Sequence, residues 1–448
     1  MLAAMENCLP MSASAQSGVE AGEIERLFRR IDAARDDLVA LTRDLIRFPT
    51  INPPGDAYEV CARFLGDRLA AKGAAVEYVR GHGEPDDSDL HPRFNVVARF
   101  EGPATGPCVH FNGHIDVVEA GLGWTVPPFE GLIRDGKVYG RGACDMKGGI
   151  AAAIIAMEAI LGEGLLEEGT LEFSGTVDEE SGGFGGVGML ARKGYFDRSR
   201  VDHVIIPEPL NPDRVCLGHR GVWWAEVEIT GQIGHGAMPF LGVSAIRGMG
   251  DFLGLLEREL LPALDGRITR MPCVPPGARH ATLNLNSIHG GQPEPFNGRP
   301  APVVADRCRL VLDRRYLIEE DLDSVKGEVV ALLERVRARQ AGLDFTVREI
   351  MTFEPTMTEP DAPLVRSLDH WIETLFGKPS THVASPGTYD QKHITRFGSV
   401  RDCVAYGPGI LDLAHQPDEW VGIEDMLLSA KVMAAATLTL LRRGRARP

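Results

Sequence analysis

The sequence predicts an α/β protein: a mainly parallel sheet flanked by helices in a discontinuous larger domain, with an inserted ferredoxin-like α+β domain. Three observations lead to this fold class. Helical and extended apolar segments alternate from residue 23 to about residue 212. The pattern then changes to alternating, half-exposed strands, and the first pattern resumes beyond residue 353. One kind of segment enclosed by two segments of another kind indicates a domain inserted into a larger one.

The first part of the larger domain combines helices with buried strands. Residues 37–48 place Leu38, Leu41 and Leu45 on one helical face, and a second helix is expected at residues 58–72. Extended apolar runs follow at residues 94–100, 108–112, 170–177 and 202–207. A helix at residues 149–161 separates the second run from the third and is long enough to cross over a sheet. Strand, helix and strand in this order favour parallel strands with helices on their faces.

The inserted part has a different order of elements. We expect a strand, a helix, two strands, a helix and a strand at residues 222–230, 244–261, 281–288, 308–315, 322–339 and 344–350. That order is the split β-α-β-β-α-β unit, with the Pro/Gly-rich residues 290–302 as a long loop. The larger domain then resumes with a helix, a strand and a closing helix at residues 363–376, 402–406 and 424–442.

Composition excludes several classes of protein. The chain has 448 residues, 44% hydrophobic and 25% charged, which is typical of a folded globular protein rather than a disordered one. A run of 18 apolar residues is absent from the sequence, so we expect no membrane-spanning helix. The 47 basic and 63 acidic side chains give a net charge of −16, and such a surface repels nucleic acids.

The cysteines and the first residues predict location and domain limits. Eight cysteines are scattered without a CxxC pair, which favours a reducing cytoplasm over a disulfide scaffold or a cysteine zinc site. The first twenty residues lack the basic and continuous apolar regions of a signal peptide, so we expect a flexible tail at residues 1–20.

The order of the predicted elements gives the domain limits. We expect the larger domain at residues 21–213 and 354–448, and the inserted domain at residues 214–353.

Acids and a histidine follow the predicted strands at their carboxyl ends. They occur in the segments NGHIDVV, GRGACDMKGG, GTVDEESGG and PEP, and they are His114, Asp116, Asp145, Glu179, Glu180 and Glu208. In an open α/β sheet, ligands bind beyond the carboxyl ends of the strands. Four segments that deliver such side chains to one edge predict a site for divalent metal ions, held by imidazole nitrogen and carboxylate oxygen.

Two details of this site follow from the residues alone. A second histidine is expected from His415, which follows the predicted strand at residues 402–406. Glu179 and Glu180 are adjacent, and neighbouring side chains on an extended backbone diverge. One of the two is therefore expected to bind metal and the other to act as a base.

The segments HIDVV, GRGACDMKGG, TVDEESGG, PEP and AHQPDE, with GHGAMP in the inserted domain, resemble one family along the chain from about residue 35. It is the dinuclear zinc family of acetylornithine deacetylase, succinyl-diaminopimelate desuccinylase, aminoacylase and carboxypeptidase G. The resemblance implies that the larger domain is catalytic and that the inserted one is a lid and dimerisation domain. It also implies two Zn²⁺ per subunit, with Co²⁺ able to substitute.

The resemblance further implies individual roles. His114 and Glu208 would hold one zinc, Glu180 and His415 the second, and Asp145 would bridge both through a turn with a cis Asp145–Met146 bond. Glu179 would be the general base, and Asp116 would orient His114. Substrate-side roles would fall on His235, lent to the partner's site in a homodimer, and on Arg315, Gly387 and Thr388.

The chain departs from the family at three places. Glu119 replaces the proline of the HxDVVP segment, and Tyr389 lies within the usual Gly-Thr-Asp. Residues 302–305 read PVVA where the family has Asn-Val-Val-Pro, so Asn297 is the candidate to replace the family's lid asparagine.

These features predict hydrolysis of the amide bond of a small N-acyl amino acid, with a metal-activated water and Glu179 as base. Glu208, where peptidase branches more often have aspartate, favours the deacylases. The alternatives are a dipeptidase, tripeptidase or carboxypeptidase on the same site, and a catalytically silent dimer that only binds ligands. We expect a cytoplasmic homodimer that binds neither nucleic acid nor membranes.

Overall fold

The computed structural model describes residues 19–291 and 301–442. Most of the predicted tail at residues 1–20 and Asn297 lie outside the described residues. The chain divides into two compact units: the first extends to Gly218 and resumes at Thr358–Val383 and from Tyr389, and the second comprises His219–Met357 and Ala384–Thr388. The chain thus leaves the first unit and returns to it.

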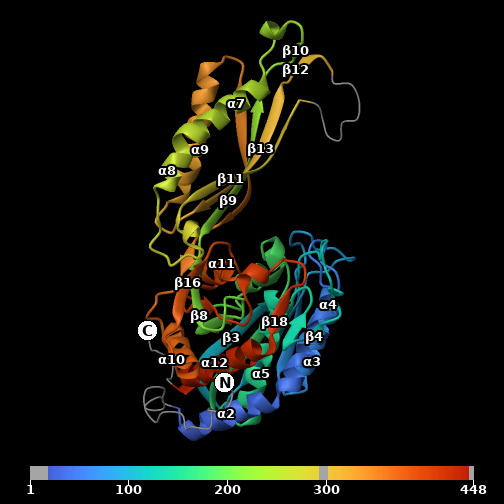
Figure 1. The fold of residues 1–448 in the computed structure, drawn as a ribbon, viewed down its shortest axis with the longest axis vertical. Helices are drawn as coiled ribbons and strands as arrows, with labels where there is room; N and C mark the ends of the chain where they lie inside the picture. Colours follow the sequence, from blue (N-terminus) through green and yellow to red (C-terminus); the bar gives the residue numbers. More distant parts are fainter. Residues whose placement is uncertain (1–18, 292–300, 443–448) are drawn as a thin grey trace. The chain divides into compact units, whose positions relative to one another are not determined.

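The first unit contains most of a nine-stranded sheet with a parallel centre (Figure 1), and the short strand β15 of this sheet closes the His219–Met357 segment of the second unit. The strands in spatial order are β1 (Ala75–Arg80), β2 (Phe94–Glu101), β6 (Glu168–Thr176), β3 (Ala104–His114), β7 (His203–Ile206), β17 (Cys403–Ala405), β8 (Arg214–His219) and β15 (Thr356–Met357), with β16 (Thr381–Ser385) also paired to β8. The four strands β6, β3, β7 and β17 run parallel, whereas β1, β2 and β8 are antiparallel to their neighbours. The sheet is therefore mainly parallel where the predicted site residues leave it.

Helices cover this sheet, and their buried residues form its core. They are α2 (Ala21–Ala33), α3 (Arg35–Ile46), α4 (Tyr58–Ala70), α5 (Gly148–Gly162), α6 (Met189–Arg192), α10 (Pro363–Phe376), α11 (Gln391–His393) and α12 (Ile423–Arg442). Helices α5 and α12 lie side by side (Figure 1), and α5 is buried on nearly all sides because it is alanine- and isoleucine-rich. A small sheet of β18 (Trp420–Gly422), β5 (Lys137–Tyr139) and β4 (Leu132–Arg134) completes the unit.

The second unit has the predicted β-α-β-β-α-β order. Its antiparallel sheet has the spatial order β11 (Thr282–Gly290), β13 (Arg307–Tyr316), β9 (Gly221–Thr230) and β14 (Asp344–Phe353). Helices α7 (Ala245–Leu255), α8 (Leu261–Asp265) and α9 (Leu322–Arg339) lie on one face of this sheet (Figure 1). Alternating residues of β9 and β13 supply the buried face. A two-stranded ribbon of β10 (Gly234–His235) and β12 (Val303–Val304) extends from the unit.

Some elements were not expected from the sequence. Helix α2 buries Ile24, Leu27 and Ile31 along one stripe, and it precedes the first predicted helix. The strands β1 and β8 were also not expected; β8 is buried along nearly its whole length and shows no alternation, and β1 is mostly exposed or half-buried. Within residues 19–291 and 301–442, none of the helices is both long and apolar enough to span a membrane.

One glycine sets the distance between α5 and the end of β7. A Cβ atom on Gly149 would lie 1.9 Å from the carbonyl oxygen of Pro207, which precedes Glu208. Two heavy atoms cannot approach that closely, so only glycine allows the first turn of α5 to pack against this segment. The contact places the start of α5, and the turn before it, next to the segment that presents Glu208.

We predict that Gly149→Ala destabilises the protein, although alanine is the better helix former. Overpacking of a dense core costs about 1–3 kcal/mol, which exceeds the roughly 1 kcal/mol gained in helix propensity. The matched control is Gly250→Ala in α7, where a Cβ atom would meet nothing within 4 Å. Thermal unfolding should show a lower midpoint for Gly149→Ala and an equal or higher one for Gly250→Ala. An unchanged midpoint for Gly149→Ala would contradict the close contact.

Candidate metal centre

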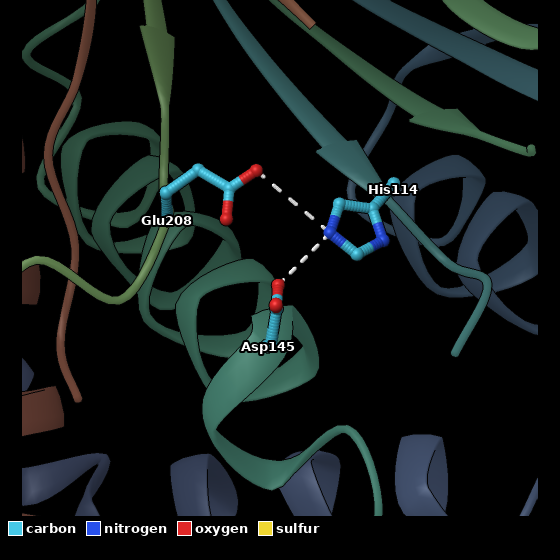
Figure 2. A group of neighbouring side chains, drawn as sticks. All are labelled: His114, Asp145 and Glu208. Carbon is cyan, nitrogen blue, oxygen red and sulfur yellow. Dashed lines mark hydrogen bonds and ion pairs between the residues drawn. The ribbon is translucent and has the colours of Figure 1, made fainter. Parts of the chain in front are cut away.

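His114 is the last residue of β3, at the carboxyl end of a strand that pairs in parallel with β6 and β7. Its side chain is buried, and its Nδ1 lies 3.1 Å from the main-chain oxygen of Asp116. Because a carbonyl oxygen only accepts hydrogen bonds, Nδ1 donates in this contact. The other nitrogen, Nε2, lies 3.1 Å from Asp145 Oδ1 and 3.8 Å from Glu208 Oε1. Figure 2 shows these three side chains converging from three segments of the first unit.

Asp145 lies at a kink immediately before α5, where its backbone leaves helical geometry at φ −116° and ψ 95°. The Asp145–Met146 peptide bond is cis, which confirms the sequence-based prediction. The turn is held by Glu419, whose Oε1 accepts from the main-chain N–H groups of Cys144 at 2.8 Å and Asp145 at 3.0 Å. Its Oε2 accepts from Arg141 at 2.6 Å. Sequence reasoning missed Glu419, although it closes the AHQPDE segment.

A second group of side chains lies next to the other carboxylate oxygen of Asp145, Oδ2. His415 Nε2 lies 3.5 Å from Asp145 Oδ2 and 3.0 Å from Glu180 Oε2. Each of the two triplets, His114–Asp145–Glu208 and Asp145–Glu180–His415, offers one ligand atom per residue, all within 4.8 Å of one another. Asp145 belongs to both triplets. The first is buried, whereas the side chain of His415 is 49% exposed, so the second triplet is open to solvent on one side.

Asp116 ties the two triplets together. Its buried carboxylate accepts from the main-chain N–H groups of Glu179 at 3.2 Å and Glu180 at 3.1 Å, and from the Asn52 amide at 2.9 Å. The Asp116 carboxylate lies 3.6 Å from His114 Nδ1, whereas the main-chain oxygen of Asp116 is closer to this nitrogen, at 3.1 Å. Asp116 therefore orients His114 chiefly through the backbone and orients the Glu179–Glu180 turn through its carboxylate. Asn52 was not expected from the sequence, because its segment carries no metal-binding pattern.

The electrostatics of the cluster fit cation binding. Burial, together with the negative charge of Asp145, raises the pKa of Glu180 to about 7 and that of Glu208 well above its usual value. Hydrogen bonds to Asp145 and Glu180 raise the pKa of His415 to about 10. The two imidazoles do not carry enough positive charge to balance three carboxylates whose oxygens lie this close together. The donor set is therefore suited to two divalent ions that share Asp145.

The adjacent acids Glu179 and Glu180 have different partners, but they lie in a 3-10 turn (Glu179–Ser181) and not on the extended backbone that the sequence analysis assumed. Glu180 faces His415, whereas Glu179 is in neither triplet. The Oε1 atom of Glu179 accepts a hydrogen bond of 2.7 Å from Lys392, whose side chain is buried. Lys392 was missed by sequence reasoning. Its position two residues after Asp390 in SPGTYDQKHI could have indicated a site residue. However, a lysine next to a histidine is usually expected to be exposed to solvent.

The remaining predicted site residues belong to the second unit. His235 is exposed in β10, and its Nδ1 accepts from the main-chain N–H of Ala237 at 3.0 Å. Arg315 in β13 donates to both carboxylate oxygens of Asp313 at 2.7 and 3.0 Å. The Gly387 N–H donates to Ser385 Oγ at 3.2 Å, and Thr388 follows it in the same loop. The structure thus brings together His114, Asp116, Asp145, Glu179, Glu180, Glu208 and His415 in the first unit.

Comparison with known proteins identifies related chains. A probable succinyl-diaminopimelate desuccinylase of Staphylococcus epidermidis is 29% identical over 416 residues, covering 88% of this chain and 95% of the relative. Human carnosine dipeptidase 1 has a similar fold, with a TM-score of 0.70 at 22% identity over 93% of this chain and 98% of that one. A dinuclear metal-binding peptidase of Bacillus subtilis has a TM-score of 0.64 at 16% identity over 92% of this chain and 99% of that one.

The sequence model of Peptidase family M20/M25/M40 matches residues 110–439, which include every proposed metal ligand. The relatives and the parallel-sheet fold agree with that match and confirm the resemblance found in the sequence. The protein therefore belongs to Peptidase family M20/M25/M40, a family of metal-dependent amidohydrolases.

Proposed function

We propose that the protein is a zinc-dependent deacylase that cleaves the amide bond of small N-acyl amino acids, as an N-deacetylase or N-desuccinylase does. The observation that carries this proposal is the pair of three-residue ligand groups sharing Asp145, with Glu179 next to them and outside both. Glu208 in the buried triplet supports a deacylase, as does the similarity to a probable succinyl-diaminopimelate desuccinylase. We also propose that the enzyme works in the cytoplasm.

In this proposal His114 and Glu208 hold one ion, Glu180 and His415 hold the other, and Asp145 is shared. The ions would supply Lewis-acid chemistry, polarising the scissile carbonyl and lowering the pKa of a water molecule. Glu179 takes the proton of the attacking water and returns it to the leaving amine. Asp116 keeps Glu179 and Glu180 in place through their main-chain N–H groups.

Substrate recognition is assigned to the second unit. Arg315 is the candidate to bind a substrate carboxylate. Its guanidinium already donates two parallel hydrogen bonds to the carboxylate of Asp313, which is the geometry that a substrate carboxylate would need. A substrate carboxylate would have to share or replace that partner. Gly387 and Thr388 form the proposed loop beside the substrate, and Asn297 is the proposed replacement for the family's lid asparagine.

A peptidase is the second candidate, and the fold similarity to human carnosine dipeptidase 1 favours it. One screen separates the two: N-acetyl, N-formyl, N-succinyl and N-carbamoyl amino acids assayed beside dipeptides and tripeptides. The deacylase proposal requires a higher kcat/KM for an N-acyl amino acid than for any peptide. A preference for peptides would replace it with the second candidate.

We further propose a homodimer in which His235 acts at the partner's site. Exposed apolar side chains flank His235 in the ribbon and the turn after it, namely Ile233, Met238, Phe240 and Leu241. Strand β11 is an edge strand of its sheet, with Ile288 half exposed. Exposed apolar side chains and the edge strand of a sheet are features that partner contacts cover.

Metal dependence provides the first test of this proposal. A chelator should abolish activity, and zinc or cobalt should restore it. Asp145→Ala should lose both ions, because it removes the shared ligand of both triplets. Elemental analysis of the purified variant measures this directly, with Asp412→Ala, an exposed acid in the 411–413 turn, as the control that keeps its metal. Full metal content in Asp145→Ala would refute the shared role.

The role of Glu179 is tested by a change that keeps its size. Glu179→Gln cannot accept a proton, so kcat should fall by at least about 10²-fold. Its metal content should stay at that of the unmodified enzyme, since Glu179 lies outside both triplets. The matched variant Glu180→Gln should instead lose metal. The opposite pattern of metal loss would show that the two roles are exchanged.

Complementation tests the role of His235 in the partner's site. Inactive His235→Ala and inactive Glu179→Ala subunits are mixed in equal amounts after reversible dissociation. If His235 acts on the partner, each hybrid dimer has one intact site, and random pairing should restore about a quarter of the full activity. Activity that stays at the level of the unmixed variants would show that His235 acts within its own subunit.

A further inference from the structure

Lys392 is a fully buried ammonium in contact with the proposed base. Its side chain is 1% exposed, and Nζ donates to Glu179 Oε1 at 2.7 Å. Burying an ammonium is costly unless it is paired and hydrogen-bonded. Glu179 and Asp390 provide that compensation, because their negative charges raise the pKa of Lys392 against the effect of burial. A buried pair of this kind holds its members in one geometry.

Asp390 itself is anchored to the sheet. Its Oδ2 accepts from the Asn112 amide at 2.7 Å and from Thr176 Oγ1 at 3.2 Å. Asn112 lies on β3 and Thr176 on β6, two neighbouring parallel strands of the sheet. The carboxylate of Asp390, whose charge acts on Lys392, is therefore hydrogen-bonded to two strands of the sheet.

The anchor continues as a polar row along the same two strands. Asn112 Oδ1 accepts from Ser174 Oγ at 2.7 Å, and His110 Nε2 lies 2.7 Å from that hydroxyl. His110 Nδ1 lies 2.9 Å from Glu172, which also pairs with Arg99 and Arg200. In the parallel register, His110 opposes Glu172, Asn112 opposes Ser174 and His114 opposes Thr176. Residues two apart share one face of a strand, so the polar row and the metal-facing histidine lie on the same face.

We infer that Lys392 is a positioning residue for Glu179: it binds Oε1, its charge is attracted by Asp390, which the polar row fixes in place, and it leaves Oε2 as the oxygen that takes the proton. A glutamate side chain has several rotatable bonds, and a misplacement of about 1 Å can cost 10²-fold in rate. Asp116 fixes only the backbone of Glu179, through its N–H group. Lys392 fixes the carboxylate end.

This inference rests on the proposed role of Glu179, and its test compares four variants in the full-length, metal-loaded enzyme. They are Lys392→Met, Lys392→Arg, Glu179→Gln and the double variant Glu179→Gln/Lys392→Met. The control is Lys431→Met, which removes a lysine paired with Asp32 at 2.7 Å between α12 and α2. The substrate is whichever amide the unmodified enzyme hydrolyses fastest, so a peptidase in place of a deacylase leaves the test intact.

Lys392→Met should lower kcat at least about tenfold, but less than Glu179→Gln does, with KM and metal content unchanged. Lys392→Arg, which keeps the charge, should recover most of kcat. In the Glu179→Gln background, Lys392→Met should cost nothing further, because Lys392 acts through the missing carboxylate. A full kcat in Lys392→Met, or an equal loss in both backgrounds, would overturn the inference.

A second variant and a crystal structure test the positioning role if Lys392→Met does not fold or if the enzyme shows no activity in the screen. If Lys392→Met does not fold, Asp390→Asn/Lys392→Met removes one buried carboxylate together with the cation, and the same kinetics are expected of it. A crystal structure of either variant should show the Glu179 carboxylate displaced, and an unmoved carboxylate would contradict the positioning role. Because this readout needs no turnover, it decides on Lys392 even if the unmodified enzyme hydrolyses no amide in the screen, a result that would refute the proposed function alone.

Discussion

Mutual repulsion among buried carboxylates is the constraint on which the rest of this site depends. In each triplet the ligand atoms lie within 4.8 Å of one another, so the Asp145 carboxylate is close to both Glu180 and Glu208. The two imidazoles of His114 and His415 cannot neutralise these three carboxylates. Such a cluster is stable only with divalent cations between its members or with protons on some of them. The turn before α5 accordingly holds Asp145 from behind through Glu419, which keeps the shared carboxylate between both triplets.

The parallel sheet is what brings these charges together. Strands β3, β6 and β7 end at one edge, and each is followed within a few residues by one of the proposed ligands or the proposed base. Asp116 then couples the segments, because one carboxylate binds the backbone of the Glu179–Glu180 turn and its main chain binds His114. A shift of any one segment would therefore be felt at both triplets, and Gly149 limits such shifts by permitting close packing at Pro207.

Positive charge is supplied to the same edge by Lys392, at a distance from the ligands. Its single positive charge offsets that of Glu179, to which it donates a hydrogen bond, and it also attracts Asp390; both acids lie outside the triplets. The polar row of β3 and β6 that holds Asp390 occupies core positions that apolar side chains usually fill. Such a row lowers the apolar burial of the sheet, and its benefit is a fixed geometry at the end of the strands.

The sequence by itself determined the fold class, the β-α-β-β-α-β order and the identity of the metal-capable residues. These follow from hydrophobic period and from residue types at strand ends, which are local properties. Glu419, Asn52 and Lys392 were missed, because each is defined by a partner far along the chain: Glu419 by Asp145, Asn52 by Asp116 and Lys392 by Glu179. Likewise, the choice between Glu179 and Glu180 could not be made from the residues alone. Tertiary structure distinguishes the two glutamates by their contacts, because packing brings His415 to Glu180 and Lys392 to Glu179, and these contacts support the proposed roles of ligand and base.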